Sequence, residues 1–214
     1  MSEELGLRER KKLQTQRSLW HAAMALFVER GFDDVSVTEI AAAADVSKKT
    51  VFNYFPTKED LVLQPLEERL DEPARIIRER AAGESATAAL RRHFLAALAA
   101  RDVVTGLNDS PAVLDVQRLV RSTPSLTRRA YAFIARSEEH LARELSRQAG
   151  QADIAPRVAA AQIIGVRNVL YAENLRRLLD GESADAVYPD AVACAERAFG
   201  LLDDGLGEYC VRRE

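Results

Sequence analysis

The chain has 214 residues, of which 47% are hydrophobic and 29% charged, and its formal net charge is −3 at pH 7. The length fits one large domain or two small ones, and the composition is typical of soluble globular proteins rather than of disordered or membrane-embedded chains. The N-terminal segment is charged and lacks an apolar secretory core, and no apolar run approaches the length of a membrane span, so we expect a cytoplasmic protein.

The first predicted helix covers residues 7–30, where apolar side chains recur at helical spacing. Gly31 follows and is expected to end this helix. The apolar stripe is expected to pack into a core and consists of Leu13, Trp20, Ala23, Met24 and Phe27.

Positive charge gathers in the first 58 residues, which hold every lysine of the chain. One interpretation is contact with nucleic-acid phosphates. The other is a lysine-poor protein that carries its few lysines on a solvated face. The cations concerned are Arg8, Arg10, Lys11, Lys12, Arg17, Lys48, Lys49 and Lys58.

Two short helices are predicted next, over residues 37–44 and 47–54, with a tight turn at residues 44–46 between them. Ser36 precedes the first helix and Glu39 lies three residues later. This spacing is typical of a capping box, in which each side chain binds the backbone N–H of the other residue.

The second short helix has two different faces. Ser47 can cap its start, and Val51 and Phe55 lie four residues apart, so both can pack against neighbouring helices. A short helix that presents cations, an amide and an aromatic ring to solvent has the chemistry of a reader of the DNA major groove. The residues expected on this outward face are Lys48, Lys49, Phe52 and Asn53.

The remaining sequence predicts helices and no strands. Thr57 and Asp60 mark the start of a fourth helix, which Pro65 and Pro73 are expected to kink or break. The fold class is therefore all-α, with about nine helices. The later helices are expected over residues 85–100, from Pro111, over residues 124–148, over residues 156–179 and over residues 189–202.

Motifs of enzymes and metal sites do not occur in the sequence. His21, His93 and His140 lack metal-binding spacing, and there is no nucleophile elbow, phosphate-binding loop or dinucleotide fingerprint. Cys194 and Cys210 are expected to be a buried thiol and a tail thiol. We therefore expect no catalytic residue, metal or cofactor, and an all-α enzyme that contains a helix-turn-helix is the less favoured alternative.

The first quarter of the chain resembles the DNA-binding domain of the TetR family of transcriptional regulators. The matching positions are Arg17, Ala22, Ala23, Leu26, Phe27, Glu29, Gly31, Phe32, Val37, Thr38, Ile40, Ala41, Val46, Ser47, Thr50, Phe55, Lys58, Glu59 and Leu61.

This resemblance implies an N-terminal three-helix domain with a helix-turn-helix, residues 1–58, and a C-terminal helical ligand-binding and dimerisation domain, residues 59–214. It implies a homodimer that binds a palindromic double-stranded DNA operator and represses transcription until a small, mostly hydrophobic effector releases it. The alternative is a regulator of this family that a protein partner controls.

Two positions depart from the family pattern. The family often has Gly in the turn, where this chain has Asp45, and Asp tolerates the positive φ that such a turn residue adopts. The family usually has Tyr at the position of Phe52, which has no hydroxyl to bind a phosphate. Tyr54 and Lys58 are the candidates to replace that contact.

Each predicted DNA contact follows from side-chain chemistry. Thr38 has a hydroxyl for a phosphate, Lys48 and Lys49 suit guanine or phosphate, and Asn53 can pair with adenine through two hydrogen bonds. The full predicted set is Thr38, Ser47, Lys48, Lys49, Thr50, Phe52, Asn53, Tyr54 and Lys58.

A homodimer is expected to form through the last two long helices, because one helix-turn-helix buries too little surface for tight, specific DNA binding. The faces proposed for this interface are Ala159, Ile163, Val166, Leu170 and Asn174 on one helix, and Ala191, Ala195, Ala198 and Leu202 on the other. The alternative is that these faces belong to the core of one chain.

Candidate ligand-binding residues are polar groups within apolar helical segments, since effector sites are mostly apolar with a few placed polar groups. Each of them has the alternative of being a surface residue or a core residue with its hydrogen bonds satisfied. They are His93, Arg118, Tyr131, His140, Arg167, Tyr171 and Asn174.

Overall fold

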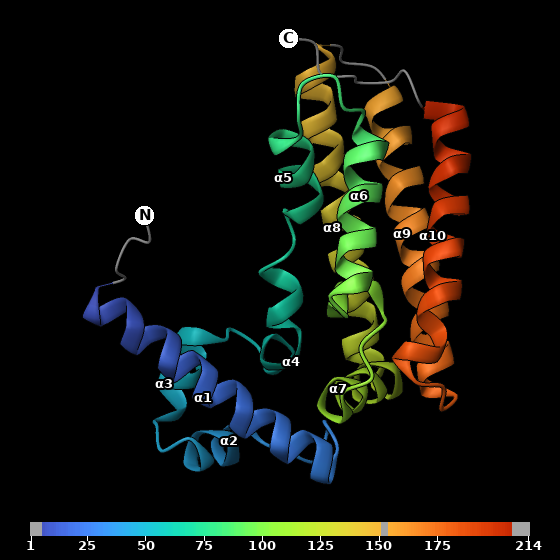
Figure 1. Cartoon of the computed structure of the whole chain (residues 1–214). Helices are drawn as coiled ribbons and strands as arrows, with labels where there is room; N and C mark the ends of the chain where they lie inside the picture. Colours follow the sequence, from blue (N-terminus) through green and yellow to red (C-terminus); the bar gives the residue numbers. More distant parts are fainter. Residues whose placement is uncertain (1–5, 151–153, 207–214) are drawn as a thin grey trace. The chain divides into compact units, whose positions relative to one another are not determined.

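The computed structural model describes residues 6–150 and 154–206, which form ten α-helices, one short 3-10 helix and no strand (Figure 1). The predicted all-α class is confirmed. The helix beyond the expected nine is α5 (Glu72–Glu79), which is separate because the chain turns before Pro73, at the start of this helix. No helix within the described ranges is both long and apolar enough to cross a membrane.

The chain forms two compact units. The N-terminal unit comprises the described residues up to Glu67 together with Asp115–Ala130, and the C-terminal unit comprises Glu68–Leu114 and the described residues from Tyr131 onward. The N-terminal unit thus extends beyond the boundary expected after residue 58 and takes in a second segment. The functional division of the chain stays a prediction.

The N-terminal unit is built around the inner face of α1. It contains α1 (Leu7–Arg30), α2 (Val37–Ala43), α3 (Lys48–Tyr54) and α4 (Lys58–Glu67), most of α7 (Pro111–Ser122) and the first turns of α8 (Pro124–Ala149). Its core includes Ala23, Phe27, Ile40, Val51 and Leu61, which the helices contribute from their inward faces.

One member of the predicted stripe on α1 lies outside this core. Leu13 is 39% exposed, and Trp20 is half-buried at the edge of the core. The residues from Arg10 to Gln14 are all exposed, so this part of α1 carries no packed face. Helical spacing of apolar residues therefore overestimated the buried length of this helix.

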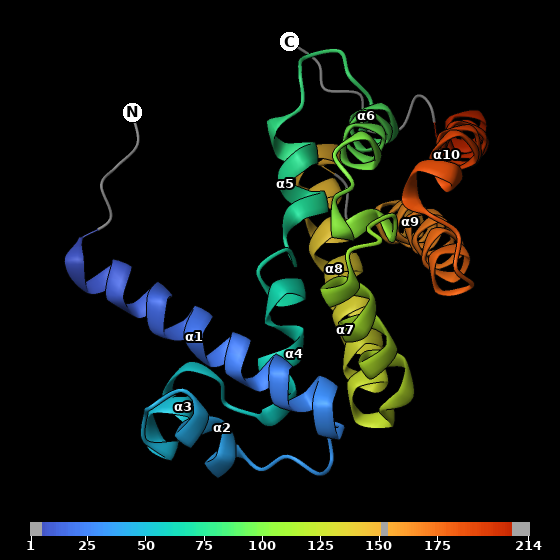
Figure 2. The same ribbon diagram turned by 60° about the horizontal axis from the view of Figure 1, so that its bottom comes forward.

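The C-terminal unit contains α5, α6 (Ala86–Ala99), the 3-10 helix η1 (Val103–Thr105), the rest of α8, α9 (Ala155–Leu179) and α10 (Ala184–Leu206). Helix α10 packs along both α6 and α9, and α5 packs on α6 (Figure 2). Phe94 of α6 and Phe199 of α10 meet in the core with ring centroids 6.0 Å apart.

The start of α10 differs from the prediction, which placed it at Pro189. The helix begins at Ala184, because Ser183 accepts a hydrogen bond from the N–H of Ala186 and Asp109 accepts one from the N–H of Ala184. Pro189 therefore lies inside the helix, where its ring removes the hydrogen bond that an N–H at this position would donate to Asp185 O.

The faces of α9 and α10 proposed for a dimer are part of the core of this chain, so that assignment was wrong. On α9, Ala159, Ile163, Leu170 and Asn174 are buried and Val166 packs against the core. On α10, Ala191, Ala195 and Leu202 are buried and Ala198 packs beside them. Both helices carry small or apolar residues on more than one face, which makes the inward face ambiguous in sequence.

No disulfide bond occurs among the described residues. Cys194 is free and half-buried on α10 rather than buried as expected, and Cys210 lies outside the described residues.

Candidate nucleic-acid interface

Helix α2 is fixed at its start by the predicted capping box. Ser36 Oγ accepts a hydrogen bond from the N–H of Glu39 at 3.2 Å, and Glu39 Oε2 accepts one from the N–H of Ser36 at 2.9 Å. Arg30, the last residue of α1, forms an ion pair with Glu39 at 2.8 Å. The hydrogen bonds from Ser36 and the guanidinium of Arg30 lower the pKa of Glu39 to about 2. The end of α1 and the start of α2 are therefore joined through one carboxylate.

The turn between α2 and α3 has the geometry of a Schellman motif. Val46 N–H donates to Ala41 O at 2.9 Å, and Asp45 N–H donates to Ala42 O at 3.2 Å. Asp45 has a φ of +53°, the left-handed conformation that Gly usually adopts at this position. The expectation that Asp45 occupies a positive-φ turn position is confirmed, and this turn sets the direction in which α3 leaves α2.

Helix α3 is capped by Ser47, whose Oγ accepts a hydrogen bond from the N–H of Thr50 at 3.0 Å. The hydroxyls of Ser47 and Thr50 also bind each other at 2.8 Å. Both hydroxyls therefore act in the cap. Val51 and Phe55 are each 1% exposed and anchor the inward face of the helix in the core.

The outward face of α3 carries the four residues expected there, Lys48, Lys49, Phe52 and Asn53, and all are exposed. Phe52 is 42% exposed, and Lys48 Nζ lies 5.9 Å from the centroid of its ring. Thr38, in the first turn of α2, is also exposed, whereas Tyr54 is half-buried and packs against the core. We call Lys48, Lys49, Phe52 and Asn53 the α3 face. Its exposure is confirmed, and its contact with DNA stays a prediction.

Lys58 is half-buried, whereas the other lysines of the chain are exposed. Its Nζ donates to Phe32 O at 2.7 Å and to Val35 O at 3.1 Å, and it lies 4.3 Å from the centroid of the Phe32 ring. The side chain is half-buried. These contacts connect the start of α4 to the loop between α1 and α2, so the phosphate contact expected of Lys58 does not fit this arrangement.

The start of α4 is stabilised by a residue that the sequence did not single out. Thr57 and Asp60 cap the helix as predicted, with Thr57 N–H donating to Asp60 Oδ2 at 2.8 Å. Arg129 of α8 donates to Thr57 Oγ1 at 3.1 Å and also contacts Asp60 Oδ1. No local pattern connects Arg129 with residues so distant in sequence.

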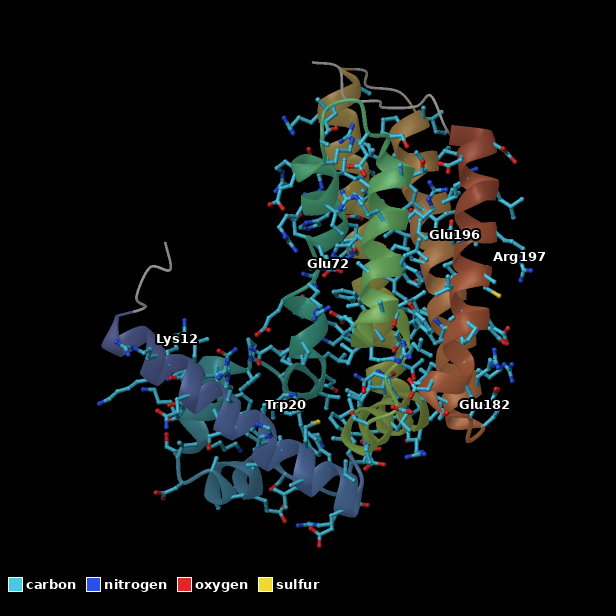
Figure 3. All side chains as sticks on the ribbon, viewed as in Figure 1. Lys12, Trp20, Glu72, Glu182, Glu196 and Arg197 are labelled. Carbon is cyan, nitrogen blue, oxygen red and sulfur yellow. The ribbon has the colours of Figure 1, made fainter. Side chains whose placement is uncertain are left out.

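The N-terminal half of α1 carries exposed cations. Lys12 extends away from the helix into solvent (Figure 3), and Arg10, Lys11 and Arg17 are also exposed. Their exposure is compatible with both interpretations of the basic N-terminal region.

The predicted ligand-binding residues do not form one site. Arg118 belongs to the N-terminal unit, where it is exposed and pairs with Asp115 at 2.9 Å, and Tyr131 is 69% exposed. Asn174 is buried and donates to Thr105 O at 2.9 Å. Next to it, Gly106 has a φ of +72°, and a Cβ atom there would lie 2.3 Å from Tyr171 O. The backbone of α9 at Tyr171 therefore passes close to Gly106, and Asn174 binds the end of η1.

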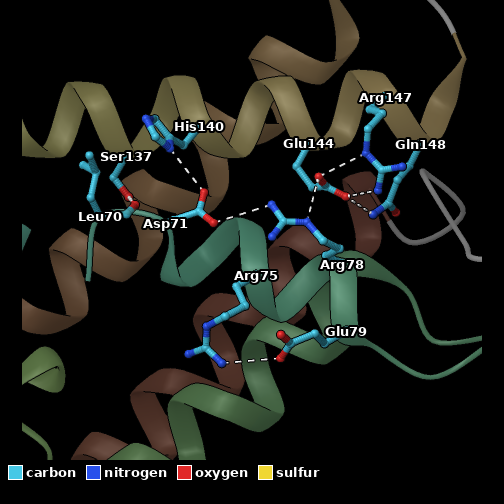
Figure 4. Close-up of polar contacts among 10 residues, drawn as sticks. All are labelled: Leu70, Asp71, Arg75, Arg78, Glu79, Ser137, His140, Glu144, Arg147 and Gln148. Atoms are coloured by element: carbon cyan, nitrogen blue, oxygen red, sulfur yellow. Dashed lines mark hydrogen bonds and ion pairs between the residues drawn. The ribbon is translucent and has the colours of Figure 1, made fainter. Parts of the chain in front are cut away.

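His140 belongs to a polar network that joins α8 to α5 (Figure 4). Its Nδ1 lies 3.2 Å from Asp71 Oδ1, and Arg78 connects Asp71 with Glu144. Glu144 is 6% exposed and also accepts a hydrogen bond from Gln148 at 2.6 Å. Burial would raise the pKa of Glu144, but the hydrogen bonds from Arg147, Gln148 and Arg78 outweigh it, so that the pKa is lowered.

His93 and Arg167 are the two candidates that influence each other electrostatically, and Glu72 forms an ion pair with Arg167. Arg167 Nη2 is 3.4 Å from Glu72 Oε2, and both side chains are mostly buried. Burial lowers the pKa of His93; the Glu72 carboxylate opposes this shift and the Arg167 guanidinium adds to it. Sequence analysis found the two basic residues but missed Glu72.

Comparisons with known proteins agree with this arrangement. The family model described as bacterial regulatory proteins, tetR family, matches residues 19–64. The transcriptional regulator TcmR of Streptomyces glaucescens is 31% identical over 195 residues, which cover 87% of this chain and 85% of that protein.

Two solved structures are similar in fold. NalD of Pseudomonas aeruginosa, a repressor of a multidrug efflux pump, matches with a TM-score of 0.57 at 20% identity. The match covers 86% of this chain and 96% of the NalD chain. FadR of Bacillus subtilis in complex with stearoyl-CoA matches with a TM-score of 0.50 at 21% identity. The match covers 88% of this chain and 98% of the FadR chain.

Proposed function

Because the chain belongs to the TetR family of transcriptional regulators, we propose that it represses transcription as a homodimer on a palindromic DNA operator until a small, mostly apolar effector binds. Members of this family are DNA-binding regulators and not enzymes. Repression is also the role of NalD, which has the same fold. A regulator of this kind acts where the chromosome is, so a cytoplasmic location is part of the proposal.

The observation that carries the proposal is the exposed α3 face on a helix whose position is fixed at both ends. The Schellman turn and the Ser47 cap fix its start, and Val51 and Phe55 hold it in the core. A helix of this kind can enter the major groove without first becoming ordered, which avoids an entropic cost of binding.

Within the α3 face, Asn53 suits adenine through two hydrogen bonds, and Lys48 and Lys49 suit guanine or phosphate oxygens. Phe52 can contact a thymine methyl or a sugar. Thr38 and the exposed cations of α1 would add phosphate contacts, which position the protein without reading sequence. In this proposal Ser47 and Thr50 cap α3, and Lys58 holds the start of α4 to the loop between α1 and α2.

The dimer is proposed through a different stripe of α9 from the one first expected. Small and apolar residues recur at helical spacing on its exposed face, where Val169 is 69% exposed. On α10, Leu201 is 75% exposed, and Arg197 points outward from the same helix (Figure 3). Small residues let two helices approach closely, which favours a helix-to-helix contact between copies. The exposed stripe on α9 is Val158, Ala161, Gly165, Val169 and Ala172.

The effector is proposed to bind in the C-terminal unit. FadR, which shares the fold, was solved in complex with stearoyl-CoA, a ligand with a long apolar chain. The C-terminal unit has an apolar core and also holds the mostly buried Glu72–Arg167 pair, so it offers the two features of an effector site.

The proposal is tested by selecting bound fragments from a pool of random duplexes with the purified full-length chain. We expect an enriched palindrome bound by two copies of the chain, as measured by sedimentation of the complex. Half-sites should lie about one helical turn apart or a multiple of it. Enrichment of no sequence, or binding that depends only on salt, would refute an operator-specific regulator.

Asn53→Ala identifies the base contact within the selected operator. If Asn53 pairs with adenine, the variant should lose about 1–3 kcal/mol of operator binding and tolerate other bases at one position of each half-site. Affinity for random duplex should stay unchanged. Gln14→Ala on the exposed part of α1 is the control. An equal loss on operator and random DNA would show that Asn53 touches backbone only.

A further inference from the structure

The Glu72–Arg167 pair leaves part of a buried cation without an acceptor. The Arg167 side chain is 13% exposed and the Glu72 side chain 11%. Arg167 donates to Glu72 through Nη2 only, at 3.4 Å. Its Nη1 is buried and has no hydrogen-bond partner among the described residues. A guanidinium is a planar fork of five N–H donors, and a buried donor that stays unsatisfied is costly.

The helices that carry this pair also form the apolar core of the C-terminal unit. Helices α5, α6 and α9, which carry Glu72, His93 and Arg167, contribute aliphatic and aromatic side chains to that core. Burial lowers the pKa of Arg167, and Glu72 opposes that shift, which reflects the same dry environment. The apolar side chains from these helices include Ile76, Ile77, Leu90, Phe94, Ile163 and Leu170.

The charges of the cluster are already balanced. Arg69 lies 2.8 Å from Asp102 and 3.7 Å from Glu72, so two guanidinium groups and two carboxylates offset one another. A second carboxylate brought to Arg167 would leave an excess negative charge in a buried place, which is unfavourable. An uncharged acceptor oxygen would satisfy Nη1 and keep the balance.

We propose that Nη1 of Arg167 binds the carbonyl oxygen of an uncharged, largely apolar effector in the interior of the C-terminal unit. This inference rests on the proposed ligand-responsive function and specifies the chemistry of its ligand. Glu72 orients the guanidinium through Nη2, so that Nη1 is presented to the ligand.

Glu72 lies close in sequence to the last residue of α4. Glu72 lies five residues after Glu67, the last residue of α4. Arg69, within this connecting segment, is held by both Glu72 and Asp102. A ligand bound at Nη1 while Nη2 stays on Glu72 would therefore stiffen the segment that follows α4.

The test measures thermal unfolding of the full chain with matched probes. One series has a decyl body (2-decanone, decanoate and decylammonium), and the other has a naphthalene body (2-acetylnaphthalene, 2-naphthoate and 2-naphthylmethylammonium). We expect at least one ketone to raise the unfolding midpoint by about 3 °C or more at roughly ten times its Kd. The matched carboxylate and ammonium should give smaller shifts.

Two variants connect the shift with Arg167. The double variant Arg167→Met, Glu72→Gln removes both charges together and should abolish the ketone shift. Arg167→Lys keeps the cation but lacks the fork, so it should reduce the shift even if the double variant folds poorly. Arg176→Met is the control, because Arg176 lies on the same helix with 55% of its side chain exposed.

Three results would overturn the proposal: no ketone shifts the midpoint, the carboxylate of a series shifts it as much as the ketone, or the double variant and Arg167→Lys both keep the full shift. The first result would also be found if an internal water satisfied Nη1. DNA selection is independent of these measurements. A chain that selects an operator but binds no ketone would refute the ligand chemistry and leave the DNA-binding function intact.

Discussion

Lys48 and Lys58 are both cations of the helix-turn-helix region, but their ammonium groups have different surroundings. Lys48 is exposed on the α3 face, with Nζ 5.9 Å from the ring of Phe52. Lys58 donates to the carbonyls of Phe32 and Val35, at 2.7 and 3.1 Å. Residue type alone predicts phosphate binding for both lysines. The structure favours that role for Lys48 and a stabilising role for Lys58.

Lys58→Met should therefore act on stability rather than on phosphate binding. Methionine keeps an apolar stem but leaves two carbonyl groups without their charged donor, which should cost about 1–3 kcal/mol of unfolding free energy. The slope of log K against log salt for DNA binding should stay unchanged. Denaturant unfolding and DNA titrations at several salt concentrations measure the two effects.

Lys48→Met is the matched control for this experiment. It should lower the salt slope by about one unit and leave stability nearly unchanged, because its ammonium is exposed. If Lys58→Met lowered the slope as much as Lys48→Met without loss of stability, Lys58 would be a phosphate contact after all.

At the scale of elements, the start of α2 should respond to acid. The pKa of Glu39 is about 2, below its ordinary value of 4.5, because Ser36 and Arg30 stabilise the carboxylate. A lowered pKa means that this contribution is present above pH 4.5 and is lost as the pH falls toward 2. Glutamine can still accept the hydrogen bond of the capping box but cannot carry the charge.

Glu39→Gln should consequently be less stable than the unmodified chain at neutral pH, and the difference should shrink as the pH falls from 6 to about 2.5. Unfolding midpoints across this range measure it. Glu29→Gln, on the exposed part of α1, controls for the general effect of removing a carboxylate. A difference that stays constant over this range would show that the carboxylate charge of Glu39 does not stabilise α2.

Elements with local signals could be predicted from the sequence. The Ser36–Glu39 box, the Ser47 cap and the positive φ of Asp45 each depend on residues at most three positions apart, and all three are present. Contacts between distant residues gave no such signal, which is why the contacts of Lys58 with Phe32 and Val35 and those of Arg129 were not predicted. The start of α10 was misplaced for a local reason, since Pro189 was read as a first helical residue while Ser183 supplies the cap.

Burial within α9 shows where sequence patterns become ambiguous. Ala159 and Ile163 were assigned to a dimer but lie in the core, whereas Val158 and Val169 are exposed. Since α9 has apolar or small residues on both sides, its periodicity does not identify the inward face. The same ambiguity explains why Asn174, buried against Thr105, was taken for a ligand-binding group.

At the scale of the whole molecule, α8 contributes to two separate cores. Leu126 is fully buried in the core of the N-terminal unit, together with Leu119 of α7. Leu141 and Leu145 are fully buried in the core of the C-terminal unit. The DNA-binding unit therefore depends on a segment that follows α4 by nearly fifty residues.

Leu126→Ala should destabilise the helix-turn-helix, although Leu126 is distant from it in sequence. Removal of a fully buried leucine side chain costs about 2–5 kcal/mol, which here would act on the N-terminal core. Amide hydrogen exchange of the full chain should then increase in α1 to α4 more than in α6, α9 and α10. Leu90→Ala, at a similarly buried position in the C-terminal core, should give the opposite pattern. Equal increases in both units for either variant would mean that the two cores unfold as one, and that a ligand in the C-terminal unit stabilises the DNA-binding unit directly.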